Sequence, residues 1–112
     1  MKVSYTSADN RLTAEIEGEK QTDVFTGLAR FQEVFEHRTC GKCSKSDTKF
    51  VVRNVDDNTF FEMHCMGCRA RLAFGQHKGK DGTLFPKRQD KDHNWLPNGG
   101  WTKYNPETKK DE

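Results

Sequence analysis

All four cysteines of the chain stand in two Cys-x-x-Cys pairs, Cys40 with Cys43 and Cys65 with Cys68, and 21 residues separate the pairs. Each pair has the spacing of a tight turn in which two thiolates accept hydrogen bonds from backbone N–H groups. Two such turns complete a tetrahedron of sulfur ligands. The pattern predicts one bound Zn²⁺ per chain, with iron in a rubredoxin-like centre as the alternative metal.

Two disulfides are the other use of four cysteines, and the cellular compartment is the first discriminator between them. Residues 1–19 hold no apolar stretch of the kind that a secretion signal needs, and no window approaches the roughly 20 apolar residues of a membrane span. We therefore expect a cytoplasmic protein without membrane association, in which cysteines bind metal. With all four positions filled by protein, we expect the zinc to be structural and not catalytic.

Composition fits a domain that depends on a metal. The chain has 112 residues, of which 32% are hydrophobic and another 32% are charged, so we expect one compact domain with a thin core. Zinc binding supplies on the order of 10 kcal/mol in comparable small units, which would offset that thin core.

The N-terminal third predicts a hairpin followed by a helix. Residues 2–7 and 11–19 read as two strands around a turn at residues 8–10, and residues 23–36 read as a helix capped by Thr22 or Asp23. The helix carries an apolar stripe that we interpret as core, the alternative being a partner-binding groove or a dimer seam; its members are Val24, Leu28, Phe31 and Phe35, widened by Phe25 and Val34.

Between the cysteine pairs, residues 49–54 and 59–64 alternate as two strands around a turn at residues 55–58. Here the sequence resembles the zinc ribbon family over residues 39–75, with "CGKC" and "CMGC" as its two knuckles and "RARLAF" as a third strand. The resemblance implies a three-stranded antiparallel sheet clamped by zinc. Ser44 and Arg69 stand where ribbons often have glycine, so we expect the knuckle geometry to differ in detail.

Together these elements predict an α+β fold, in which the hairpin and helix pack on a three-stranded zinc ribbon and an irregular tail follows. The predicted parts are a hairpin–helix unit at residues 1–38, the ribbon at 39–75 and a loop-rich tail at 76–112.

Charge is divided unevenly along the chain: residues 1–36 carry a net −3 and residues 69–112 a net +4. Strand alternation places apolar side chains on one sheet face and basic ones on the other. The apolar set, predicted to be buried, is Phe50, Val52, Phe61, Met63, Ala70, Leu72 and Phe74. The basic face is predicted to hold Lys49, Val51, Arg53, Phe60, Glu62, His64, Arg69 and Arg71.

In the tail, Lys78, Lys80, Lys87, Arg88 and Lys103 alternate with Phe85, Trp95, Trp101 and Tyr104. Cations mixed with aromatic rings are what a single-strand nucleic-acid binder uses. The candidate contacts are Lys49, Arg53, Phe60, Arg69, Arg71, Lys78, Lys87, Arg88, Trp101 and Tyr104. One alternative is that these charges form a solvated surface of mixed sign. The other is that the tryptophans anchor the tail to the core, and Trp95 is the stronger candidate for that role.

The whole chain also resembles small proteins of phage and prophage replication or recombination regions, which implies an accessory role in binding single-stranded DNA. No P-loop, deaminase or nucleophile-elbow motif is present, and we expect no enzymatic activity and no catalytic histidine. Two hypotheses remain: a nucleic-acid-binding module, or an adaptor or inhibitor that binds a protein of the replication, recombination or transcription machinery through its acidic N-terminal unit. Homo-oligomerisation stays possible under both.

Overall fold

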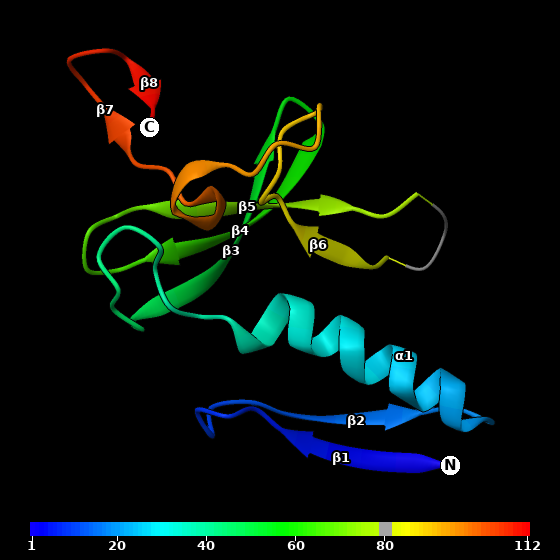
Figure 1. Ribbon diagram of the computed structural model, residues 1–112. Helices are drawn as coiled ribbons and strands as arrows, with labels where there is room; N and C mark the ends of the chain where they lie inside the picture. Colours follow the sequence, from blue (N-terminus) through cyan, green and yellow to red (C-terminus); the bar gives the residue numbers. More distant parts are fainter. Residues whose placement is uncertain (79–81) are drawn as a thin grey trace. The chain divides into compact units, whose positions relative to one another are not determined.

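The computed structural model describes residues 1–78 and 82–112, so Lys80 of the predicted basic tail lies outside the described residues. The chain forms two compact units, one of residues 1–37 and 77–85, the other of residues 38–76 and 86–112. They contain a β-hairpin, a helix and an antiparallel sheet, which confirms the predicted α+β class (Figure 1). The division at residues 38 and 75 stays a prediction.

In the first unit, the predicted hairpin is confirmed: β1 (Lys2–Thr6) pairs antiparallel with β2 (Thr13–Glu17). The turn between them uses Asn10, whose φ of 61° is left-handed, a conformation that asparagine adopts more easily than most residues. Ser7 is buried and its backbone N–H donates to the carbonyl of Leu12 at 2.8 Å, which closes the hairpin end.

The helix α1 (Gln21–Phe31) lies along the hairpin and continues into a π-helical turn, η1 (Gln32–Glu36) (Figure 1). The predicted cap was wrong, because Lys20 occupies that position. Asp23 instead lies in the first turn, where its carboxylate accepts the backbone N–H of Lys20 at 3.1 Å. At Gly27 the helix runs so close to β2 that a methyl group there would lie 2.6 Å from Cγ2 of Ile16.

The apolar stripe of this helix is buried only in part. Val24 and Val34 are buried, whereas Leu28, Phe31 and Phe35 are half-buried. Phe25, expected to widen the stripe, points outward with 75% of its surface exposed. A two-stranded hairpin is too narrow to cover a stripe of that width, which explains the difference.

The sheet has the strand order β3-β4-β5-β6, with β3 at Thr48–Val55, β4 at Asn58–Cys65, β5 at Arg71–Gln76 and β6 at Leu84–Pro86. Asp56 and Asp57 both have left-handed φ and form the two-residue turn between β3 and β4. The fourth strand was not expected, since three residues ending in proline show no alternation. The face predicted as buried is buried at Met63, Leu72 and Phe74, but Phe50 and Val52 at its β3 edge are exposed.

The tail contains more structure than expected. After a 3₁₀ turn, η2 (Pro97–Gly100), Thr102 bridges to Arg71, and β7 (Tyr104–Asn105) pairs with β8 (Lys110–Asp111). Trp101 is the anchor of this segment, with 3% of its surface exposed, whereas Trp95 is 75% exposed. The expectation that Trp95 anchors the tail was therefore wrong.

In the described part of the chain, no helix combines the length and the apolar composition that crossing a lipid bilayer requires.

Candidate metal centre

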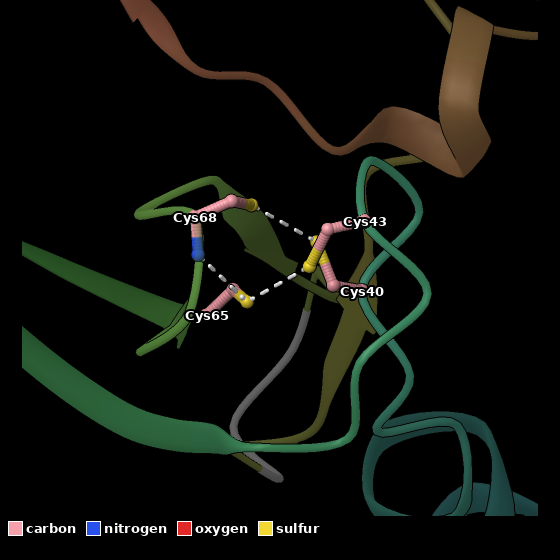
Figure 2. Close-up of side chains that lie close together, drawn as sticks. All are labelled: Cys40, Cys43, Cys65 and Cys68. Atoms are coloured by element: carbon pink, nitrogen blue, oxygen red, sulfur yellow. Dashed lines mark hydrogen bonds between the residues drawn. The ribbon is translucent and has the colours of Figure 1, made fainter.

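The sulfur atoms of the four cysteines lie close together in the second unit, and each of the two Cys-x-x-Cys turns supplies two of them (Figure 2). All four lie within 4.8 Å of one another, with 3.6 Å between Sγ of Cys40 and Cys68 and 3.5 Å between Sγ of Cys43 and Cys65. Metal–sulfur bonds of about 2.3 Å in a tetrahedron place neighbouring sulfurs about 3.8 Å apart. Disulfide sulfurs lie about 2 Å apart, and all four cysteines are free. The four predicted ligands are therefore arranged so that they could hold one metal ion.

The two knuckles, residues 40–45 and 65–70, have the same backbone pattern. In the first, the N–H of Ser44 donates to the carbonyl of Cys40 at 2.9 Å and the N–H of Cys40 donates to the carbonyl of Lys45 at 2.9 Å. In the second, the N–H of Arg69 donates to the carbonyl of Cys65 at 3.0 Å and the N–H of Cys65 donates to the carbonyl of Ala70 at 2.8 Å. Two different sequences thus form the same turn, and each turn carries two of the four sulfurs.

The residue after the second cysteine of each knuckle is left-handed, with φ of 62° at Ser44 and 69° at Arg69. This is the conformation that glycine adopts without strain and that costs other residues about 1–2 kcal/mol. The absence of glycine therefore leaves this feature of the turn unchanged, and the expected difference does not appear at these residues. Other interactions of each knuckle must therefore offset the conformational cost at Ser44 and Arg69.

Burial raises the pKa of the buried thiols, whereas hydrogen bonds from backbone N–H groups lower it. Burial raises the pKa of Cys40 to about 12, against N–H groups of Cys43 and Lys42 that favour its thiolate. Burial also opposes ionisation of Cys65, but hydrogen bonds from the N–H groups of Cys68 and Gly67 lower its pKa to about 7. Four crowded thiols cannot all ionise near neutral pH without a cation, so metal binding would release protons and hold the sulfurs together.

The surroundings of the site differ between the knuckles. The indole of Trp101 and the backbone of Asn98 lie against Gly41, where a methyl group would come within 2.8 Å of Cδ1 of Trp101 and overlap the Asn98 carbonyl. At Gly67 the nearest group is the flexible side chain of Lys45, which reaches across from the first knuckle. The amine of Lys45 would partly offset the negative charge of four thiolates.

The basic sheet face next to the site contains a charge network that the sequence did not reveal. Arg53 donates to both carboxylate oxygens of Glu62, from Nε to Oε1 and from an Nη to Oε2, each at 2.8 Å, and Nε2 of His64 lies 2.8 Å from Oε1. Glu62 is 6% exposed, and the Arg53 hydrogen bonds lower its pKa to about 2 despite burial. Two donors of Arg53 are therefore already used within the protein, and its guanidinium also lies 5.3 Å from the Phe60 ring centre.

The other predicted contacts on this face differ in availability. Arg71 pairs with Asp111 at 2.8 Å, whereas Lys49 and Arg69 have no ion-pair partner among residues 1–78 and 82–112. The strand register aligns Lys49, His64 and Arg71 in one row across β3, β4 and β5. Phe60 is exposed at 41%, two positions along β4 from Glu62.

The predicted contacts of the tail are not brought together into one site. Lys78 belongs to the first unit, while Lys87, Arg88 and Tyr104 belong to the second. Lys87 and Tyr104 are exposed and Arg88 is half-buried. Trp101 is buried and cannot stack on a base in this conformation, so the exposed Trp95 takes its place among the candidate contacts.

Comparisons with family models, curated proteins and solved structures found no match for this chain. Any functional conclusion therefore depends on the residues of the site and of the surrounding surface.

Proposed function

We propose that the protein is a zinc-stabilised, non-catalytic module that binds nucleic acid, with single-stranded DNA favoured, as an accessory to replication or recombination. Four thiolates are a ligand set that selects zinc among the common divalent ions, iron–sulfur sites being the other tetrahedral case. The closed set of ligands leaves no position for a substrate, which supports a structural metal. Zinc would then hold the sheet that presents the binding surface.

The observation that carries the nucleic-acid proposal is the row of Lys49, His64 and Arg71 across the sheet. Adjacent strands lie about 4.8 Å apart, so the row places three basic side chains side by side. To contact a phosphate backbone, His64 and Arg71 would exchange their pairs with Glu62 and Asp111 for phosphate oxygens. Arg69 precedes the row at the second knuckle and Phe60 lies exposed on the same face. The second unit carries 13 Lys and Arg against 9 Asp and Glu, so its field attracts a polyanion.

Single strands are favoured because exposed aromatic rings accompany the charges. Phe60, Trp95 and Tyr104 are all exposed large side chains of this basic unit. Stacking of a base on such a ring contributes about 1–3 kcal/mol, and a duplex does not offer its bases for stacking.

Fluorescence anisotropy with single- and double-stranded oligonucleotides at two salt concentrations tests the proposal. Arg69→Ala should weaken binding to all sequences alike and reduce the salt slope by about 0.7, the value for one phosphate on a single strand. Lys2→Ala removes the same charge from the acidic first unit and should leave the slope unchanged. Phe60→Ala or Trp95→Ala should lose about 1–3 kcal/mol with the slope unaltered. Absence of binding to any single strand at low salt would refute the proposal.

A second candidate function, binding of a replication, recombination or transcription protein, is favoured by one observation in the first unit. An open pocket of about 330 Å³ lies between β2 and the helix, lined mainly by apolar groups that include Ile16, Phe31 and Phe35. A partner held in that pocket would bind with little dependence on salt, in contrast to binding through phosphates.

A further inference from the structure

We propose that Trp101 and the turn before it, residues 98–101, are a cover of the first knuckle that slows exchange of the metal. This inference rests on the metal centre proposed above and assigns to the tail a role in it. Trp101 is a positioning residue here, because its ring contacts the knuckle backbone and no part of it is a ligand.

Two contacts and the burial of one ligand carry the proposal. The indole of Trp101 is almost completely buried, and its Cδ1 lies close to Gly41, the residue after the ligand Cys40. The carbonyl of Asn98 occupies the space where a side chain on Gly41 would stand. Cys40 itself has 1% of its surface exposed, whereas Cys43 and Cys68 are partly exposed, so the cover would protect the Cys40 side of the site.

The backbone of the cover is built for this close approach. Asn98, Gly99 and Gly100 are three successive left-handed residues, with φ of 59°, 65° and 91°. A methyl group on Gly100 would overlap the carbonyl of Lys87 and come within 3.2 Å of Cδ1 of Leu72. The turn therefore fits between the knuckle and the sheet because glycine leaves room there.

Both ends of the segment that carries the cover are fixed on β5. The N–H of Lys87 donates to the carbonyl of Ala73 at 2.9 Å, while Thr102 and Arg71 exchange two backbone hydrogen bonds of 2.8 and 2.9 Å. Arg88 and the exposed Trp95 lie on the loop between these two points. Release of Trp101 from the knuckle would thus loosen a loop that we assign to the binding surface.

The rate at which a colorimetric chelator removes zinc from the folded protein tests this role. The shell around a metal site controls solvent access, and loss of an outer-shell contact typically costs about 10- to 100-fold in metal affinity. We expect Trp101→Ala to release zinc about 10-fold faster or more. Trp101→Phe, which keeps a ring, should stay near the wild-type rate, and Trp95→Ala, which alters the exposed tryptophan, should match it.

Gly41→Ala provides a second variant, because its methyl group must displace Asn98 and Trp101 while every ligand remains. In a Trp95→Phe background, where Trp101 is the only tryptophan, this variant should release zinc faster and shift the emission to longer wavelength. A folded Trp101→Ala protein with wild-type release would overturn the proposal, and if Trp101→Ala does not fold, wild-type release by Gly41→Ala would do so. A wild-type chain that binds no zinc would instead contradict the metal centre itself.

Discussion

The two knuckles share a backbone but are held in place by different parts of the chain. The second knuckle connects β4 to β5, so strands on both sides fix it, and Met66 at its tip is exposed. The first knuckle has a strand only on its C-terminal side, and Trp101 packs against it from the tail. A metal ion that bridges them would join a turn fixed by local pairing to a turn fixed by a distant segment.

The largest expected effect is loss of the ion itself. Cys40→Ser and Cys65→Ser should both unfold the second unit, because the binding free energy of the metal, on the order of 10 kcal/mol, is also folding free energy. Circular dichroism, and tryptophan emission in the Trp95→Phe background, would show it. If Cys40→Ser kept a native sheet, the second knuckle and its strands would be stable without the metal, and the two knuckles would not depend on it equally.

Replacing the glycine of each knuckle by alanine tests directly whether the two knuckles are supported by different parts of the chain. Gly41→Ala forces a methyl group into Asn98 and Trp101, so we expect a loss of about 1–3 kcal/mol in the free energy of unfolding. The methyl group of Gly67→Ala would lie 3.1 Å from Cδ of the flexible Lys45 side chain and at an ordinary contact distance of 3.6 Å from Sγ of Cys65, so this variant should change stability by about 0.5 kcal/mol or less. Chemical denaturation of the zinc-loaded proteins measures this difference. Equal losses in the free energy of unfolding for the two variants would show that the tail does not support the first knuckle more than the second.

Glu62 tests whether the sheet has support that does not depend on the knuckles. Glu62→Gln removes a charge-assisted pair with Arg53 and should lower the free energy of unfolding by about 1–2 kcal/mol, less than for a fully buried pair because Arg53 is partly exposed. The pKa of Glu62 is lowered from 4.5 to about 2, so this contribution is present above pH 4.5 and fades between pH 4.5 and 2. The difference between wild type and Glu62→Gln should therefore not shrink between pH 7 and pH 5. A difference that shrinks within that interval would show that Glu62 is not held ionised as described.

The smallest effect concerns the end of the tail, where Asp111 pairs with Arg71. If Arg71 contacts phosphate, Asp111→Asn should free it and raise the affinity for single strands by about 2- to 5-fold, as expected for an exposed ion pair. Glu107→Gln removes the same charge from the adjoining turn and serves as the control. Anisotropy titrations in which the two variants behave alike would show only a change in net charge.

The sequence was sufficient for the features that depend on local pattern. The cysteine spacing predicted that the four sulfurs come together, and alternation predicted the hairpin, three strands of the sheet and the turn at residues 55–58 between two of them. What it could not show depends on contacts between distant residues. Alternation placed Glu62 on one face with Arg53 and His64, but only the structure shows that Glu62 is buried and accepts two hydrogen bonds from Arg53.

The two tryptophans show the same limit. Trp95 precedes Leu96 and Pro97 and was expected to be an anchor, while Trp101 follows Asn98, Gly99 and Gly100. The structure buries Trp101 because Gly100 lets the chain approach Lys87 and Leu72, and Gly41 leaves room for Asn98 and Trp101 against the first knuckle. These two glycines were the signal, since closely packed backbones need residues without side chains.

The most direct measurement is native mass spectrometry of protein purified without added metal, before and after treatment with a chelator. We expect the mass of the chain plus one zinc ion, and loss of the native charge-state distribution when the chelator removes the ion. A chain without metal that is four hydrogens lighter, as two disulfides require, would contradict the metal centre, as would a metal-free chain with reduced cysteines and an unchanged fold.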